Sequence, residues 1–161
     1  MARSTQLEEL LHARVVRTAS VSGGCINDAR RVDLADGRTV FVKSCAGGPA
    51  SMFPEEARSL RALAAAPGAP PVPDVLHVSE ELLVLEWLAP GRLGLEGWSE
   101  LGRAFAALHR STSERGHGFD ADNFCGSTPQ PNGWIRDGVA FFAERRIGFQ
   151  VRMARDAGLL S

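Results

Sequence analysis

The sequence predicts an α+β fold in which a five-stranded antiparallel sheet with one packed helix precedes a helical part. Two observations lead to this prediction. Along the chain, the predicted elements run as three strands, one helix, two strands and then helices. No helix separates the first three strands, and antiparallel pairing between neighbours is therefore the simplest arrangement of the sheet. With 161 residues, the chain is long enough to bury a hydrophobic core.

The first three strands follow a short helix. A capping-box pattern from Thr5 to Glu8 lies in STQLEELLH and predicts that helix. RVVRTASV, residues 14–21, predicts a strand. Residues 26–44 predict two further strands joined at Asp36–Gly37, a strong hairpin signal.

A long helix and a second hairpin complete this half of the chain. Residues 51–66 form the clearest helical pattern, with Pro54 in the first turn and Leu60 and Leu63 on an apolar stripe. The proline-rich PGAPPVP then ends the helix. DVLHVS and ELLVLEWL predict a hairpin that turns near residues 79–81.

The second half of the chain is predicted to be mainly helical. WSELGRAFAALHRST predicts a helix. Residues 113–133 have the composition of a loop, and loops of about twenty residues inside a compact domain are usually functional or disordered. Residues 134–158 predict a long helix that Gly138 and Gly148 weaken and that Gly158 caps.

Composition excludes several classes of partner. Lys plus Arg is 18 and Asp plus Glu is 19, without the clustered basic surplus of a nucleic-acid binder. Arg30–Arg31 and Arg145–Arg146 are predicted to lie on solvated strand and helix faces. Three cysteines without CxxC spacing form no zinc pattern with the histidines. No stretch resembles a secretory signal or a membrane helix, so we expect a cytoplasmic protein that contacts neither membrane nor nucleic acid.

Lys43 and Glu56 are the candidate functional pair. Spacings of three and four place four residues of the long helix on one face: Phe53, Glu56, Leu60 and Leu63. Glu56 therefore points toward the sheet, where an unpaired carboxylate is costly. Lys43, the only cation of TVFVKS, is its candidate partner. The alternative is that Lys43 ends a strand with its amine in water.

A glycine turn precedes this lysine in the chain. SGGC contributes Gly23 and Gly24, whose backbone N–H groups can approach an anion without interference from side chains. It matches neither GxxxxGK[ST] nor GxGxxG, so an ordinary turn is the alternative. A glycine turn, a strand lysine, an inward helical glutamate and a strand leading into a break follow the order of the ATP-holding half of a kinase.

The chain resembles the fructosamine kinase (ketosamine 3-kinase) family, on the protein-kinase-like fold shared with aminoglycoside phosphotransferases. The matching segments are SGGCIND (22–28), VFVKS (40–44), MFPEEARSLRAL (52–63), LLVLEWL (82–88), LGRAFAALH (101–109), GFDADNFCGSTPQPNGW (118–134) and FFAERRIGFQVRMA (141–154). DNFCGSTPQPN is the most discriminating of them. The resemblance implies a kinase-like N-terminal lobe with its hinge over residues 1–88 and the first helices of an incomplete C-terminal lobe over residues 89–161.

The resemblance also implies roles for individual residues. Lys43 would hold the α- and β-phosphates of ATP, and Glu56 would fix its position. The turn covering the phosphates would comprise Gly23, Gly24, Ile26 and Asn27. The hinge, whose main chain reads the adenine edge, would comprise Glu86, Trp87 and Leu88. The sugar side would be shaped by Asn123, Gly126, Pro129, Gln130 and Trp134, where Trp134 has the alternative of anchoring the final helix in the core.

The sequence departs from the family pattern in two places. Gly138 stands where the family tends to show a second tryptophan, which leaves the sugar-side wall open to question. The catalytic Asp and the side chains that hold Mg²⁺ would follow Ser161, so the chain alone is expected to be inactive. The HGFD segment at 117–120 comes too early in the chain to supply the catalytic base.

Cys25 lies inside the glycine turn. Backbone N–H donors there would favour its thiolate and make it open to oxidation. The alternative is a small, packed residue without redox chemistry.

Three functions are consistent with the sequence. The first is ATP-dependent phosphorylation of the C3 hydroxyl of a ketosamine (a fructosamine or ribulosamine on a protein lysine or small amine), which leads to deglycation. The second is a non-catalytic nucleotide-binding or interaction module, whose exposed lobe surface would favour a homodimer. The third is an aminoglycoside-type kinase, against which GSTPQPN argues.

Overall fold

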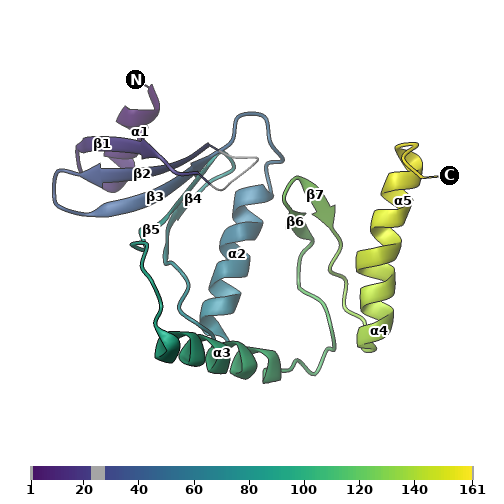
Figure 1. Ribbon diagram of the computed structural model, residues 1–161. Coiled ribbons are helices and arrows are strands. Elements are labelled where there is room, and N and C mark those ends of the chain that lie inside the picture. Colours follow the sequence, from purple (N-terminus) through teal and green to yellow (C-terminus); the bar gives the residue numbers. More distant parts are fainter. Residues whose placement is uncertain (1, 23–27, 161) are drawn as a thin grey trace.

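A computed structural model of the protein describes residues 2–22 and 28–160, with no side-chain description for residues 2–4. Its main feature is a five-stranded antiparallel sheet in the order β1-β2-β3-β5-β4 (Figure 1). The strands are β1 (Val15–Ser20), β2 (Asp28–Leu34), β3 (Thr39–Ser44), β4 (Val75–Val78) and β5 (Leu82–Glu86). The predicted α+β class and the antiparallel pairing are confirmed.

Each face of the sheet is covered by one helix. Side chains alternate along β3, so Val40 and Val42 are buried on the face that packs against α1 (Ala2–Leu11). Phe41 lies on the opposite face, which packs against Phe53 and Ala57 of α2 (Met52–Ala65). Two hydrophobic cores therefore hold the sheet between the helices, and Figure 1 shows α2 leading away from it toward the second half of the chain.

The turn predicted at Asp36–Gly37 joins β2 to β3. Gly37 has φ +88°, which L-residues rarely adopt, and a glycine there avoids the steric cost. The backbone N–H of Arg38 donates to Asp36 Oδ1 at 3.0 Å. The predicted capping box of α1 is wrong, because the helix begins at Ala2 and Thr5 lies inside it. Glu8 accepts a hydrogen bond from the Val15 N–H at 2.8 Å instead, which ties α1 to β1.

The second half of the chain contains a hairpin within the predicted loop. After α3 (Leu95–Arg110) come β6 (Asn123–Cys125) and β7 (Thr128–Gln130), which pair antiparallel. β6 also contacts α2, so the hairpin connects the helical half to the sheet half of the molecule. Figure 1 shows the hairpin between α2 and the C-terminal helical segment.

The C-terminal helical segment starts later than the pattern predicts. Asp137 caps it by accepting a hydrogen bond from the Ala140 N–H at 2.8 Å. The segment runs as α4 (Gly138–Phe141), the π-helix η1 (Phe142–Gly148) and α5 (Phe149–Asp156). Gly158, with φ +70°, closes its end as predicted. None of the helices in the described part of the chain is long and apolar enough to cross a membrane.

Candidate nucleotide and substrate sites

The first candidate site is built around Lys43 and Glu56. β3 places Lys43 on the face of the sheet that carries α2, and α2 directs Glu56 toward it. Lys43 Nζ lies 2.8 Å from Oε1 and 2.6 Å from Oε2 of Glu56. The two side chains retain 21% and 32% of their exposed surface, so the pair is partly shielded from water. The predicted ion pair therefore forms, and both side chains remain partly exposed.

The rest of α2 departs in part from the predicted stripe. Phe53 is fully buried, and its ring centroid lies 6.0 Å from Lys43 Nζ. Leu63 is 40% exposed and packs in neither core, because α2 extends beyond the sheet there. Glu55, the neighbour of Glu56 on α2, is the more buried of the two glutamates, with 12% of its side chain exposed against 32%, and its Oε2 lies 3.2 Å from Arg58 Nε.

An aromatic pair lies on the same face as the lysine. Phe41 precedes Lys43 by two residues on β3, and its ring centroid lies 6.4 Å from that of Trp87. The Arg31 guanidinium lies over the Trp87 ring at 5.2 Å and bonds Asp33 Oδ1 at 2.9 Å. The sequence reasoning missed Phe41, although the period of two that separates it from Lys43 is the signal that would have found it.

The predicted hinge begins at Glu86, the last residue of β5. The Glu86 N–H donates to the Asp74 carbonyl at 2.9 Å, and Glu86 Oε2 accepts from the Asp74 N–H at 3.3 Å. Glu86 therefore ties the end of β5 to the start of β4. Trp87 is half-buried and Leu88 is exposed. The residues predicted to cover the phosphates (Gly23, Gly24, Ile26 and Asn27), together with Cys25, lie outside the described residues.

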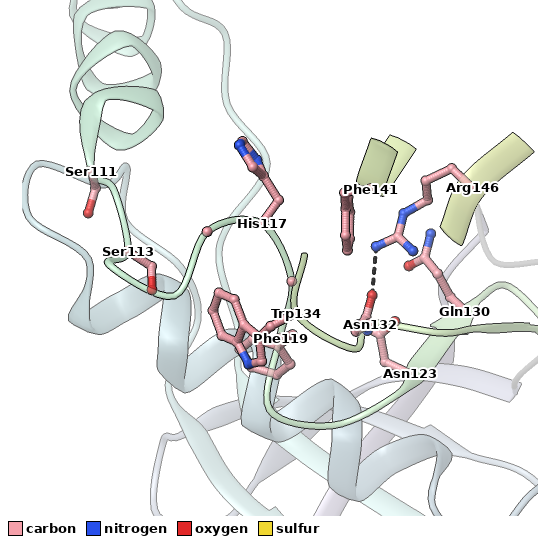
Figure 2. A pocket seen from close by; sticks show the side chains of 12 residues that line it. Ser111, Ser113, His117, Phe119, Asn123, Gln130, Asn132, Trp134, Phe141 and Arg146 are labelled. Carbon is pink, nitrogen blue, oxygen red and sulfur yellow. Dashed lines mark hydrogen bonds between the residues drawn. The ribbon is translucent and has the colours of Figure 1, made fainter. Parts of the chain in front are cut away.

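The second candidate site is a pocket of about 430 Å³ in the helical half (Figure 2). It is open to solvent, and its lining comes from the segment after α3, the β6–β7 hairpin, the stretch that follows the hairpin and the C-terminal helical segment. Its lining mixes aromatic rings with amide, hydroxyl and cationic groups: Ser111, Ser113, Gly116, His117, Gly118, Phe119, Asn123, Gln130, Asn132, Trp134, Phe141 and Arg146. Three predicted substrate residues, Asn123, Gln130 and Trp134, are brought together here.

Two predicted substrate residues do not line this pocket. Gly126, with φ +67°, forms the turn between β6 and β7. Pro129 pairs with Phe124 across the hairpin and is exposed. Their position makes them part of the hairpin frame that holds Asn123 and Gln130 opposite each other.

Asn132 is the best-connected residue of the pocket, and the sequence reasoning did not select it. It is 2% exposed, and its N–H donates to Asp122 Oδ1 at 2.7 Å. Its Nδ2 donates to the Ala121 carbonyl at 3.1 Å and to Asn123 Oδ1 at 2.9 Å. Arg146 Nη2 donates to Asn132 Oδ1 at 2.6 Å. Asn132 thus fixes the strand that carries Asn123.

The prediction that Arg145–Arg146 lies on a solvated helix face is wrong. Arg146 turns into the pocket, because it donates to the Pro131 carbonyl at 2.7 Å as well as to Asn132. Arg145 Nε is buried without a hydrogen-bond partner. Charge alone did not distinguish a solvated arginine from one that anchors a distant loop.

Trp134 is held by polar neighbours at the edge of the pocket. The Arg115 guanidinium lies over its ring at 4.3 Å, and its Nε1 donates to Asp120 Oδ1 at 3.2 Å. Hydrogen bonds from Arg115 and then from Trp134 lower the pKa of Asp120. Gly138, at the position of the expected second tryptophan, packs against His117, where a Cβ atom would lie 2.7 Å from Nε2. A larger residue at this position would require the imidazole to move.

Comparison with known proteins gives a consistent result. Residues 1–160 match the family model described as fructosamine kinase. A probable ketoamine kinase of Synechocystis sp. is 40% identical over 146 residues, which cover 88% of this chain and 49% of the relative. A chloroplastic protein-ribulosamine 3-kinase of Arabidopsis thaliana is 35% identical over 150 residues, which cover 89% of this chain and 45% of the relative.

A solved structure agrees with these sequence matches. The crystal structure of a Thermobifida fusca protein assigned as a fructosamine-3-kinase superposes with a TM-score of 0.84 at 30% identity, over 98% of this chain and 55% of that one. The chain therefore spans about half the length of the curated relatives it matches.

Proposed function

We propose the function of this chain from one premise: the chain belongs to the fructosamine kinase family. On that premise, its function is the ATP-dependent phosphorylation of ketosamines, in which this chain carries the ATP-binding half. Residues 1–88 form the kinase-like lobe with its hinge, and residues 89–161 begin the helical lobe. The observation that carries the proposal is the Lys43–Glu56 ion pair.

The geometry around Lys43 supports a nucleotide site. Part of the Lys43 side chain is exposed, and an ammonium has three N–H donors, so Lys43 can contact phosphate oxygens while the carboxylate fixes its position. The Phe41–Trp87 pair lies on the same face, and side chains two residues apart on a strand are separated by about 7 Å. A nucleobase against these rings would extend its phosphates toward Lys43. The main chain of Trp87 and Leu88 then serves as the hinge.

The pocket supports the sugar side of the proposal. Asn123 and Gln130 present amides that both donate and accept hydrogen bonds, which suits a polyhydroxylated ligand. The rings of Phe119, Trp134 and Phe141 add apolar surface to the same cavity. We propose that the sugar of the ketosamine binds here.

The metal has no complete site in the part of the chain that the structure describes. No group of three His, Cys, Asp or Glu side chains within residues 2–22 and 28–160 is placed to hold an ion. Mg²⁺ bound to the phosphates neutralises charge during phosphoryl transfer. We propose that its ligands and the base that accepts the C3 hydroxyl proton belong to another part of the whole protein. The second candidate is a nucleotide-binding module without turnover, which is also consistent with the lack of a metal-holding group among the described residues.

Calorimetric titration with ATP and an assay with fructosyl-lysine test these proposals. We expect the 161-residue chain to bind ATP, and Lys43→Met to weaken binding at least tenfold, about 1.4 kcal/mol. A longer form of the protein should phosphorylate fructosyl-lysine, whereas the chain alone should not. If Lys43→Met binds ATP as tightly as the unchanged chain, the nucleotide site is wrong. If the 161-residue chain alone phosphorylates fructosyl-lysine, the base that accepts the C3 hydroxyl proton must lie within this chain.

A further inference from the structure

The side-chain amide of Asn132 is held in one orientation. Its Oδ1 accepts a hydrogen bond from Arg146 Nη2 at 2.6 Å, and its Nδ2 donates to the Ala121 carbonyl at 3.1 Å. An arginine only donates hydrogen bonds, and a backbone carbonyl only accepts them. If the amide were turned over, two donors would face each other at Arg146 and two acceptors at Ala121. Asn132 is 2% exposed, and buried polar groups that lose their partners destabilise a fold strongly.

This orientation determines that of the neighbouring amide, Asn123. Asn132 Nδ2 also donates to Asn123 Oδ1 at 2.9 Å, so the atom of Asn123 that faces Asn132 must be the acceptor oxygen. The nitrogen of Asn123 is then the other end of the amide. It has no acceptor among the described residues and is not buried. Because Asn123 lines the pocket, it offers a ligand an N–H donor that it cannot exchange for an acceptor.

The amide of Gln130 differs from that of Asn123 in this respect. Gln130 is the register partner of Asn123 on β7 and also lines the pocket. Within residues 2–22 and 28–160, no hydrogen bond holds its side chain, so this amide can turn either end toward a ligand. Figure 2 shows both amides at one end of the pocket, beside the bond from Arg146 to Asn132. The pocket therefore combines one fixed donor with one adaptable amide.

We propose that Asn123 is a specificity-determining residue that donates through Nδ2 to the one sugar oxygen of a ketosamine that carries no proton, and that Arg146 is a positioning residue that acts through Asn132. This inference rests on the proposed function, which supplies the ketosamine. In the open-chain sugar this oxygen is the keto oxygen on C2, and in the cyclic sugar it is the ring oxygen bonded to C2. Every other sugar oxygen is a hydroxyl, which can turn to donate or to accept and needs no fixed partner. The contact would also hold the neighbouring carbon C3, whose hydroxyl is phosphorylated in the proposed reaction.

Two ligands that differ at C2 test the donor at Asn123. Fructosyl-lysine has the proton-free oxygen, whereas hexitol-lysine, its borohydride-reduced form, has only hydroxyl oxygens on its sugar. Both are titrated by calorimetry into the 161-residue chain and its variants. The readout is the ratio of the fructosyl-lysine affinity to the hexitol-lysine affinity, in which effects common to both ligands cancel. If neither ligand binds the unchanged chain, the proposal is wrong.

Asn123→Asp reverses the polarity of the group that faces the ligand. The carboxylate still accepts from Asn132 Nδ2, but it has no donor for the pocket, so it repels the proton-free oxygen and suits a hydroxyl. We expect the affinity ratio to fall about tenfold. Gln130→Glu is the matched control, because it places the same charge on the facing strand, and it should leave the ratio within about twofold. An unchanged ratio in Asn123→Asp, or equal falls in both variants, would refute the donor role.

Variants of Arg146 test the positioning role. Arg146→Lys keeps a group that only donates, so it should keep the ratio of the unchanged chain. Arg146→Met removes the donor to Asn132 while the Ala121 carbonyl remains, so the ratio should fall by only about threefold. Arg152→Met makes the same change at an exposed position on α5 and should leave the ratio unchanged. A full ratio in Arg146→Met, or a lost ratio in Arg146→Lys, would contradict the role, and Arg146→Lys decides if circular dichroism shows that Arg146→Met does not fold.

ATP titration of the same samples separates this inference from the proposed function. Normal ATP binding with an unchanged ligand ratio in Asn123→Asp would refute only the role of Asn123. A ratio that falls as expected, in a chain that does not bind ATP, would support the sugar contact and refute the nucleotide site at Lys43.

Discussion

Replacing Glu56 by Gln isolates the charge of the central ion pair while keeping the shape of the side chain. With Nζ to oxygen distances of 2.6 and 2.8 Å, the direct attraction is about 6 kcal/mol at an effective dielectric constant of about 20. The exposed fractions of 21% and 32% reduce the net value, because water screens the pair and both side chains must be ordered. A loss of about 1–2 kcal/mol remains, above that of a fully exposed pair.

This loss should appear mainly in ATP affinity. Without the carboxylate, the Lys43 ammonium is no longer held where phosphates would meet it, and about 1.4 kcal/mol corresponds to a tenfold weaker Kd. Urea unfolding should show a smaller decrease of about 1 kcal/mol in the free energy of unfolding. Glu55→Gln is the matched control, since it makes the same change one residue earlier on α2 and affects a carboxylate that lies beside Arg58.

The comparison of the two variants decides the outcome. We expect Glu55→Gln to leave ATP affinity within twofold of the unchanged chain, whatever its effect on unfolding. Equal weakening of ATP binding by both variants would refute the reasoning, because the effect would then come from α2 stability and not from the ion pair. A double-mutant cycle with Lys43→Met should give a coupling of about 1–2 kcal/mol in ATP binding.

Three further predictions concern stability. Asn132→Ala should lower the free energy of unfolding by about 2–3 kcal/mol in urea titrations, because it leaves the Ala121 carbonyl, Asn123 Oδ1 and Arg146 Nη2 without the buried amide that pairs with them; a loss under 1 kcal/mol would mean that these bonds are replaced. Asp137→Ala should cost about 1 kcal/mol, with Asp137→Asn nearly neutral, and equal losses in the two variants would exclude capping as the cause. The pKa of Asp120 is lowered on folding, so the ionised carboxylate stabilises the fold above its unfolded pKa of about 3.9, and this stabilisation is lost as pH falls through the folded pKa. In urea unfolding, Asp120→Asn should therefore have a lower free energy of unfolding than the unchanged chain at pH 7, and the two free energies should converge in acid.

The sheet and α2 could be predicted because their signals are local. Alternation along β3 and the spacing of Phe53 and Glu56 on α2 each follow from a few neighbouring residues. The ion pair between Lys43 and Glu56 could be predicted because the helical spacing directs Glu56 toward the sheet, and Lys43 is the only cation of the strand segment TVFVKS. Leu63 was misplaced because periodicity gives the face of a helix and not the length over which the sheet covers it.

The substrate pocket could be predicted only in part. β6 and β7 are three residues long, and Gly126 and Pro129 gave them the composition of a loop. The contact between Arg146 and Asn132 joins η1 to the irregular segment after β7, 14 positions apart, and no periodic pattern encodes it. Resemblance identified Asn123, Gln130 and Trp134, whereas the arginine that shares their pocket was found only from the structure.

A crystal structure of the 161-residue chain with a non-hydrolysable ATP analogue tests the central claim most directly. We predict phosphate oxygens within about 3 Å of Lys43 Nζ, with the Lys43–Glu56 pair intact and the adenine against Phe41 and Trp87. A nucleotide bound elsewhere, or an ion pair that opens without any phosphate contact to Lys43, would contradict the account.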